Sequence, residues 1–484
     1  MPPFTHPIAS APELCKLDAS ALSQLYASGE VSPVEVTQAA LVRAQDVQAD
    51  FNAFSFIDHE GALEMARASE TRWRRREPLS VVDGIPTTIK DIVWVRDWVV
   101  RFGSETTLSM PLAADAPSVR LLRDAGATFI GQTTSPEFAW KPVTDSPLRG
   151  VTRNPWDSSK TPGGSSGGAA VAAATGAGVL HLGTDGGGSI RIPAAFTGIV
   201  GLKPTFGRVP NYPPSGFFSV SHTGPLARSA GDAARMLSVM SGRDMRDWTQ
   251  GAGELPDTHL KKVELGALVI GFWATPPVGR LDPQVEVAVA TTVRRLEEQG
   301  ASIEPFTLPV DDIVTLFDRH WLAGAALRYS TMPEADRAKM DPGLRKAAAR
   351  GMALTAIDLL AAQVARAHFG AAMDAAFKSV DIIVSPAVAY LPFDTRLDAP
   401  PTSGADNWPD WASFSYPLNL TGQPACVVPC GLSVEGLPIG LQIIGPRGGD
   451  ALVLSVAKAL EGAILLSNWW EAPSQSAVTS GARH

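Results

Sequence analysis

Apolar and polar positions alternate along the chain in patterns that change between helical and strand spacing. Ser32, Pro33 and Glu35 form an N-terminal helix signature, with a capping serine, a proline in the first turn and a glutamate three residues after the cap. With the apolar periodicity, such signals predict helices over 20–28, 32–48, 59–75 and 118–125. Short apolar runs predict strands over 93–100 and 128–131. The alternation of strand, helix and strand indicates an α/β protein.

The second half of the chain adds longer helical patterns and two buried strands. Helices are expected over 230–241 and 285–299, with a long alanine-rich helical stretch over 311–377. Strands are expected over 268–273 and 381–385, a polar linker over 242–261, and an irregular segment rich in Pro, Asp and Trp over 390–411. The alternation of strands and helices supports a largely parallel or mixed sheet covered by helices.

Composition narrows the classes of function. The chain has 484 residues, 45% of them hydrophobic, and a formal net charge of −8, so it has no basic surplus for binding nucleic acid. Its three cysteines, Cys15, Cys426 and Cys430, form no disulfide framework and indicate a reducing, cytoplasmic compartment. No signal peptide and no apolar run of ~18 residues is visible, so neither export nor a membrane span is expected. Histidine pairs at metal-ligand spacing are also missing, and no metal is expected.

The segment 160–193 contains the strongest candidate chemistry. Ser165 and Ser189 each lie in a glycine-rich turn, and three glycines precede Ser189. A nucleophilic hydroxyl needs an exposed turn, a base and free backbone N–H groups for an oxyanion. Glycines let the backbone approach a ligand closely, so Gly186 to Gly188 are candidates for those N–H groups. Lys90, at the end of an apolar β-branched run, is the candidate base, because burial favours its neutral amine.

The chain resembles the amidase signature family of serine hydrolases in five separate segments. Residues 163–168 read GGSSGG and residues 183–194 read GTDGGGSIRIPA, and both segments match the family pattern. Gly84, Pro86, Lys90 and Asp91 match an upstream element, and segments 198–208 and 418–446 also look like the family. One departure is Gly186, where relatives often carry a larger residue.

The resemblance implies roles for particular residues. Ser189 would be the nucleophile, Ser165, on a cis peptide bond, the bridging serine, and Lys90 the final base. The N–H groups of Gly186, Gly187, Gly188 and Ser189 would form the oxyanion hole, while Ser166, Asp185 and Arg191 would organise the site. The fold implied by the resemblance is the amidase signature fold, an α/β fold with a large mixed central sheet covered by helices on both faces. No cofactor is implied.

A single domain over 1–484 is expected, acting as a monomer or homodimer. Its catalytic core would cover 60–228 and 375–470. A variable, substrate-covering region would lie at about 242–374 and 390–412.

The substrate is less sharply indicated than the chemistry. An aryl or otherwise hydrophobic small-molecule amide or carbamate (urethane) would suit the aromatic residues expected near the site, namely Tyr212, Phe217, Phe218, Trp321, Tyr390, Phe393, Trp408 and Trp411. Esters would serve the same chemistry. The alternative is the glutaminase subunit of a tRNA-dependent amidotransferase, but that branch typically has polar residues where this chain has Ile192 and the segment 219–224.

Two weaker alternatives are an α/β-hydrolase and a catalytically inactive scaffold. An α/β-hydrolase would have Ser165 in its nucleophile elbow, but the polar residues before this serine do not fit the strand that such an elbow requires. The presence of Lys90, Ser165 and Ser189 together argues against a scaffold with a dead site.

Overall fold

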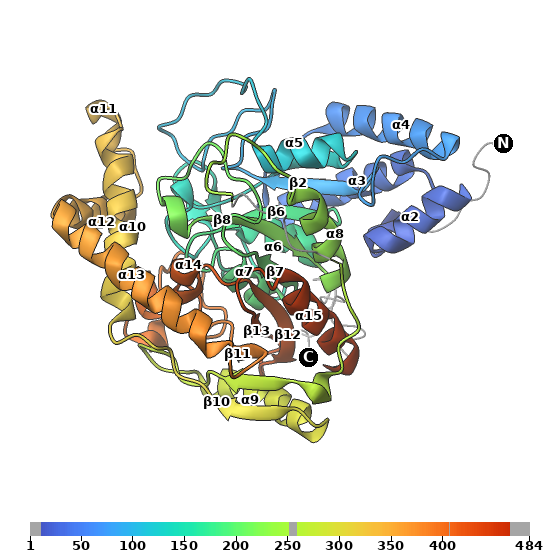
Figure 1. Ribbon diagram of the computed structural model, residues 1–484. Helices are drawn as coiled ribbons and strands as arrows, with labels where there is room; N and C mark the ends of the chain where they lie inside the picture. Colours follow the sequence, from blue (N-terminus) through green and yellow to red (C-terminus); the bar gives the residue numbers. More distant parts are fainter. Residues whose placement is uncertain (1–10, 251–258, 406, 465–484) are drawn as a thin grey trace, which may run out of the picture.

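The computed structural model describes residues 11–250, 259–405 and 407–464. A sheet of eleven strands runs through the centre of the molecule, with helices packed around it (Figure 1). Across the sheet the strands are β1 (Phe54–Ile57), β3 (Thr128–Thr133), β2 (Pro86–Lys90), β6 (Leu180–Asp185), β8 (His222–Ala227), β7 (Val200–Lys203), β12 (Ala425–Leu432), β13 (Pro438–Ile444), β11 (Ile382–Pro386), β9 (Val269–Phe272) and β10 (Ser302–Pro305). A separate pair is formed by β4 (Asp145–Ser146) and β5 (Gly150–Val151).

The large sheet is mixed, as the sequence predicts. Strand β2 pairs in parallel with β3 and β6, and β9 pairs in parallel with β10 and β11. The other neighbouring strands are antiparallel. The helices are α1 (Ala11–Leu14), α2 (Ala19–Ser28), α3 (Pro33–Phe51), α4 (His59–Arg75), α5 (Pro117–Asp124), α6 (Gly167–Thr175), α7 (Arg191–Thr197), α8 (Ala230–Met240), α9 (Pro283–Glu298), α10 (Ile313–Ser330), α11 (Glu334–Arg337), α12 (Pro342–Met352), α13 (Ala356–Ala376), α14 (Pro417–Thr421) and α15 (Asp450–Ile464).

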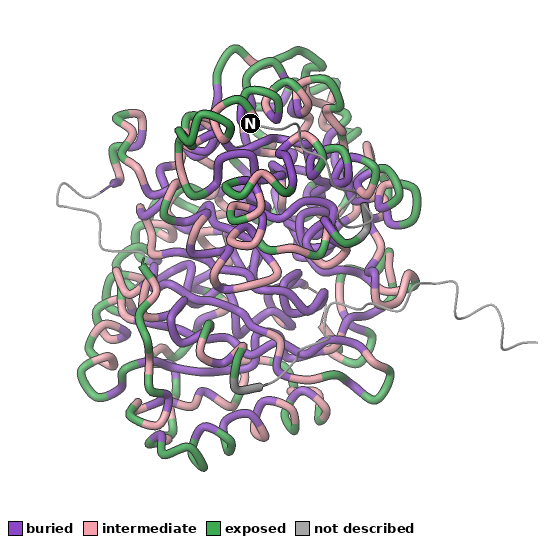
Figure 2. The backbone as a smooth tube through the Cα atoms, turned by 90° about the vertical axis from the view of Figure 1, so that its right-hand side faces the viewer, coloured by how far each residue is buried: buried purple, intermediate pink, exposed green. Residues whose placement is uncertain are grey.

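Helices cover both faces of the sheet, and the strands show this in their side chains. Successive residues of a strand point to opposite faces. On β11, Ile382 and Val384 belong to a core shared with α8 and α15, while Ile383 belongs to a second core shared with α6, α7 and α10. The strands are therefore buried on both sides, which Figure 2 shows as a continuous buried interior.

The predicted N-terminal helices are confirmed in position and in their caps. Helix α3 begins after Ser32, whose side chain accepts a hydrogen bond from the N–H of Glu35, and the Glu35 carboxylate accepts one from the N–H of Ser32. Helix α4 has the predicted bounds, and α5, α8 and α9 lie within a few residues of theirs.

One expectation about local structure is wrong. Residues 93–100 form no strand, because Asp97 adopts a left-handed backbone conformation (φ 69°) that interrupts an extended run. The segment is an irregular loop, and most of its apolar side chains are buried. The predicted helical stretch over 311–377 is confirmed, and it is divided into four separate helices, α10 to α13. The expected linker 242–261 falls partly outside the described residues.

Helices α10 to α13 stand beside the sheet, in yellow and orange at the left of Figure 1. Strands β9 and β10 come from the same expected covering region, 242–374, but extend the edge of the sheet.

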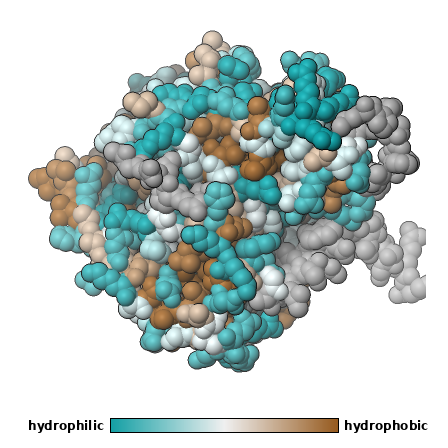
Figure 3. All heavy atoms as spheres, turned by 45° about the vertical axis from the view of Figure 1, so that its right-hand side comes forward, coloured by the Kyte–Doolittle hydropathy of each residue, from teal (hydrophilic) through white to brown (hydrophobic). Residues whose placement is uncertain are grey.

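Within the described residues no single helix has the length and hydropathy needed to cross a bilayer. Helices α12 and α13 have that length and hydropathy only when they are taken together, and the chain bends by 97° between them. On the face in Figure 3, apolar side chains gather in separate patches among polar ones.

Candidate active site

Lys90 is the last residue of β2 and is completely buried. Its Nζ lies 2.7 Å from Ser165 Oγ, 2.9 Å from Ser166 Oγ and 3.0 Å from Thr184 Oγ1. The sequence motifs indicate the lysine and both serines but not Thr184. The signal for this residue was its place beside Asp185 in the GTD segment, at the end of β6.

Burial sets the protonation state of Lys90. Desolvation holds the pKa of the amine well below its ordinary value, and the negative charge of Asp185 opposes this only in part. A neutral amine has two N–H donors and one lone pair, so one of its three hydroxyl partners donates a proton to it. The hydroxyl of Ser166 donates to the carbonyl oxygen of Thr184 at 3.1 Å. The lone pair of Lys90 is therefore left for Ser165 or Thr184.

Ser165 lies in a turn just before α6, and the Gly164–Ser165 peptide bond is cis, as the resemblance implied. The glycine is required by close packing, since a Cβ at position 164 would lie 2.7 Å from the carbonyl carbon of Val143. Ser165 itself is fully buried. This tight turn places the serine hydroxyl against Lys90.

Ser189 lies in the turn between β6 and α7, next to the Ser165 turn. The carbonyl oxygen of Ser189 accepts a hydrogen bond from the N–H of Ser166 at 3.0 Å, which joins the two serine turns. Asp185 shapes the Ser189 turn by accepting hydrogen bonds from the N–H groups of Gly188 (2.8 Å) and Ile190 (3.2 Å). Ser189 remains 6% exposed.

The arrangement corrects the expected set of oxyanion donors. The N–H of Gly188 already donates to the Asp185 carboxylate and is not free for a ligand. The N–H groups of Gly186, Gly187 and Ser189 have no hydrogen-bond partner among the described residues. The glycine pattern did not distinguish these four groups, because the distinction depends on where the Asp185 side chain folds back.

Asp185 and Arg191 form a buried ion pair with two contacts, each of 2.9 Å. Burial favours a neutral carboxyl, but the Arg191 guanidinium outweighs it and holds the pKa of Asp185 below its ordinary value. The same guanidinium donates to the carbonyl oxygen of Ser415 and to the side chains of Asn419 and Gln442. It thus joins the Ser189 turn to the C-terminal half of the sheet.

His222 packs against this network. Its Nδ1 lies 3.0 Å from the carbonyl oxygen of Val220 and 3.3 Å from that of Asp185, and burial keeps its pKa well below the ordinary value. Among the described residues, no group of three or more His, Cys, Asp or Glu side chains has the arrangement of a metal site.

A cavity of about 830 Å³ adjoins the buried lysine cluster at Thr184. Tyr212 and Phe217, two of the predicted substrate contacts, line this cavity. Phe217 stacks on Trp321 with ring centroids 3.8 Å apart. A Cβ at position 186 would meet the Trp321 ring at 3.1 Å, so this indole fills the space beside the unusual glycine. The Trp408 ring packs close to Gly187, since a Cβ at position 187 would lie 2.7 Å from that ring.

Three aromatic residues expected at the substrate site lie elsewhere. Trp411 is fully buried, stacks on Phe196 and donates its Nε1–H to the carbonyl oxygen of Asp398. Phe393 packs edge-on against the same indole ring. The hydroxyl of Tyr390 accepts a hydrogen bond from the N–H of Arg280. These rings hold the irregular segment in the core, and composition alone did not separate this role from substrate contact.

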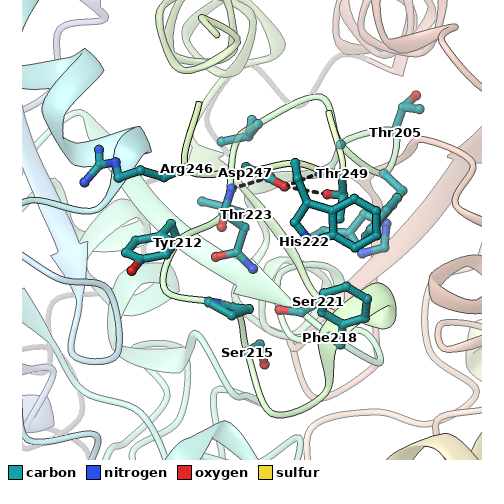
Figure 4. A pocket seen from close by; sticks show the side chains of 16 residues that line it. Thr205, Tyr212, Ser215, Phe218, Ser221, His222, Thr223, Arg246, Asp247 and Thr249 are labelled. Carbon is teal, nitrogen blue, oxygen red and sulfur yellow. Dashed lines mark hydrogen bonds between the residues drawn. The ribbon is translucent and has the colours of Figure 1, made fainter. Parts of the chain in front are cut away.

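Phe218 lines a smaller side pocket of about 150 Å³, shown in Figure 4, rather than the large cavity. Its ring stacks on Trp248. The side pocket and the large cavity share part of their walls, including Tyr212, Ser215 and Ser221. The loop that carries these residues therefore separates the two spaces.

A family model described as Amidase matches residues 35–454, and the chain belongs to that family. The acylamidase of Rhodococcus erythropolis is 33% identical over 453 residues, covering 92% of this chain and 95% of that protein. One subunit of the glutamyl-tRNA(Gln) amidotransferase of Chloroflexus aggregans is 35% identical over 478 residues, covering 93% of this chain and 96% of that protein.

Among solved structures, a bacterial aryl acylamidase of the amidase signature enzymes superposes with a TM-score of 0.87 at 28% identity, covering 94% of this chain and 98% of that one. A 6-aminohexanoate cyclic dimer hydrolase complexed with substrate gives a TM-score of 0.82 at 26% identity, covering 94% and 98%. The chain is therefore an amidase signature hydrolase.

Proposed function

We propose that this protein is a stand-alone amidase that cleaves the C–N bond of aryl or hydrophobic amides, and of carbamates of similar shape, by covalent catalysis. The observation that carries the proposal is the fully buried Lys90 amine within 2.7 Å of Ser165 Oγ, next to the turn of Ser189. An amine kept neutral at this position is able to accept a proton from a serine hydroxyl.

In the proposed mechanism protons move along the two serines to the lysine. Lys90 Nζ takes the hydroxyl proton of Ser165, which takes that of Ser189, and Ser189 Oγ attacks the carbonyl carbon. Collapse of the tetrahedral intermediate breaks the C–N bond, and the proton returns along the same path to the departing amine nitrogen. A water molecule then uses the same relay to hydrolyse the acyl-enzyme, which frees the acid and restores the Ser189 hydroxyl.

The oxyanion is assigned to the N–H groups of Gly186, Gly187 and Ser189. These groups have no partner among the described residues, and a free N–H aimed at the developing charge is worth ~3 kcal/mol of transition-state stabilisation. The hydrogen bond from Gly188 to Asp185 supports this role indirectly, because it fixes the turn that carries the other three.

Aromatic and aliphatic residues in the cavity wall support a hydrophobic substrate. They include Trp94, Phe102, Leu108, Phe138 and Phe217. A cavity of this size, largely apolar with a few polar groups, is typical of small-molecule sites. The acylamidase among the relatives favours the same interpretation.

The second candidate is a glutaminase that works within an amidotransferase, which the similarity to the Chloroflexus aggregans protein favours. The position of His222 speaks against it. This histidine lies in the segment where the glutaminase branch typically carries acidic and amide side chains, and it is buried and uncharged against Asp185. A glutamine substrate would therefore have fewer polar and charged partners at this segment than in the glutaminase branch.

The test is hydrolysis of a substrate panel by the wild type and by Ser189→Ala. The panel contains glutamine, an aliphatic amide, a p-nitroanilide, a p-nitrophenyl ester and an aryl carbamate. We expect turnover of the aromatic amide or carbamate, together with labelling by a fluorophosphonate, and both should be lost in Ser189→Ala.

The control is Ser238→Ala, which removes an exposed serine on α8 and should change neither readout. Turnover of glutamine alone would assign the chain to the amidotransferase branch. Activity that survives in Ser189→Ala would refute the nucleophile.

A further inference from the structure

One face of helix α10 runs from the glycine turn along the large cavity. Trp321, Gly324, Ala325 and Arg328 are spaced by three and four residues and therefore share a face. Trp321 stands against Gly186, and the other three residues line the cavity. Gly324 lets the Phe217 ring approach, since a Cβ there would lie 2.5 Å from that ring. The helix thus connects the candidate oxyanion turn with Arg328.

Aromatic rings support the guanidinium of Arg328. Its Cζ lies 4.1 Å from the ring centroid of Phe138 and 6.0 Å from that of Phe102, within cation–π range. Both phenylalanines have left-handed backbones, with φ of 49° and 55°, and the N–H of Phe138 donates to the carbonyl oxygen of Phe102 at 2.8 Å. Such strained conformations concentrate at functional sites. Both rings also line the cavity.

The guanidinium of Arg328 has hydrogen-bond donors that the protein leaves unused among the described residues. Among the described residues, its side chain takes part in no hydrogen bond or ion pair. The other ionised residue of the cavity wall, Asp336, is bound to Lys339 at 2.8 Å. Glu137, whose charge acts on Arg328, accepts hydrogen bonds from the hydroxyl of Ser104 and the N–H of Asp341. The guanidinium donors of Arg328 are thus available to a ligand.

A guanidinium with one face on aromatic rings and its N–H edge free is suited to a carboxylate, which it binds through two parallel hydrogen bonds. The helix also gives the spacing. Seven residues separate Trp321 from Arg328, which at 1.5 Å per residue is ~10 Å along the axis.

We propose that Arg328 is a specificity-determining residue that binds a carboxylate of the substrate about 10 Å from the scissile carbonyl. The substrate class is an amide with an apolar linker and a distant acid group. The inference rests on the proposed function, because it uses the Ser189 turn as the reacting end.

The experiment compares charged and neutral substrates of matched shape. In the first series, monoanilides of dicarboxylic acids of increasing length are compared with alkanoyl anilides of equal length. In the second series, N-acyl 4-aminobenzoates are compared with N-acyl 4-methylanilines, so that the carboxylate is on the amine side. Wild type is measured beside Arg328→Met and Arg328→Lys.

The matched control is Arg337→Met, since Arg337 also lies over an aromatic ring, Tyr329 at 4.7 Å, but does not line the cavity. We expect wild type to prefer the acid in one series by ~10–100-fold in kcat/KM, as a charged hydrogen-bonded pair of ~1.5–3 kcal/mol implies. Arg328→Met should lose this preference, so that the acid and its neutral partner are hydrolysed by that variant with similar kcat/KM. Arg328→Lys should keep only part of it, and Arg337→Met all of it.

Equal kcat/KM for acid and neutral partners in both series would overturn the inference, and so would a preference that persists in Arg328→Met. Either result would leave the proposed function standing if the neutral anilides are hydrolysed in a Ser189-dependent way. If no amide is hydrolysed, titration calorimetry of the same acids against Ser189→Ala still decides the carboxylate site: binding lost in the additional Arg328→Met change supports it, and binding unaffected by that change overturns it.

Discussion

At the scale of single residues, the protonation state of Lys90 decides whether the proposed relay can work. A lysine at its ordinary pKa is protonated at neutral pH and cannot accept a proton. This amine is fully buried and has three hydroxyl partners in place of water, and among the described residues no carboxylate forms an ion pair with it. The amine is therefore stable in its neutral form, which has a lone pair for a hydroxyl proton.

This predicts the direction of the pH dependence of catalysis. Because the base acts only when deprotonated, kcat/KM for a neutral anilide should rise with pH through the lowered pKa of Lys90 and level off well below the ordinary value of 10.5. Lys90→Met should lower kcat by ~10²–10⁴-fold and abolish that rise.

Lys203→Met provides the control, because the pKa of Lys203 is lowered to about 7, yet its Nζ donates to the carbonyl oxygens of Pro204 and Gln423 rather than to a serine. The rising limb should persist in that variant. A limb that disappears with Lys203 and survives in Lys90→Met would reverse the assignment.

At the scale of elements, the turn between β6 and α7 depends on one carboxylate. Asp185 binds two N–H groups of the turn and the Arg191 guanidinium, all of them buried. Asp185→Asn should lower the free energy of unfolding by ~3–5 kcal/mol, because it leaves a buried guanidinium without its counter-charge. It should also lower kcat, since the turn holds the candidate oxyanion donors. Urea unfolding and anilide turnover measure the two effects.

The control for this substitution is Asp124→Asn. Asp124 pairs with Arg120 at 2.8 Å on an exposed surface of α5, and such pairs contribute ~0–1 kcal/mol. If both variants lose the same free energy of unfolding, burial does not make the Asp185–Arg191 pair contribute more to stability than an exposed pair.

The sequence predicted the structure best where short motifs contain the residues that make the interaction. The Lys90 and Ser165 cluster and the α3 capping box follow from local motifs, and the structure places them as expected. Local pattern failed where long-range packing decides. The run 93–100 has the pattern of a strand yet packs as a loop, and Trp411 resembles a pocket residue yet fills the core against Phe196. Arg328 had no motif, because its significance depends on rings that are distant in the sequence.

At the scale of the whole molecule, the central strands of the sheet bury lysines that the unfolded chain would expose. Lys203 ends β7, in the middle of the sheet, and is fully buried. Burial and the nearby charge of Arg191 lower its pKa to about 7, although Asp185 and Asp450 act in the opposite direction. In the folded protein above pH ~7 this amine is neutral, whereas in the unfolded chain it stays protonated up to its ordinary pKa.

The free energy of unfolding should therefore rise with pH above neutrality. Between the folded pKa of about 7 and the ordinary value of 10.5, the unfolded state binds a proton that the folded state does not, so the linkage slope is positive. From pH ~7 to ~8.5 the gain from Lys203 is ~2 kcal/mol, at 1.36 kcal/mol per unit. The lowered pKa of Lys90 acts in the same direction.

At higher pH the buried thiols oppose this rise. Burial raises the pKa of Cys430 to about 12 and also raises that of Cys426, so the unfolded chain loses these protons first and the thiols' contribution to stability falls above pH ~9. The contribution of Lys203 stops rising near its ordinary pKa of 10.5. Urea unfolding at successive pH values should show a maximum between these two regions. Lys203→Met should flatten the rising part, and Lys458→Met, at an exposed lysine of α15, should not. If the free energy of unfolding of the wild type is constant or falls between pH ~7 and ~8.5, Lys203 is charged in the folded protein. The carboxylates of Asp185 and Asp450 would then stabilise that charge.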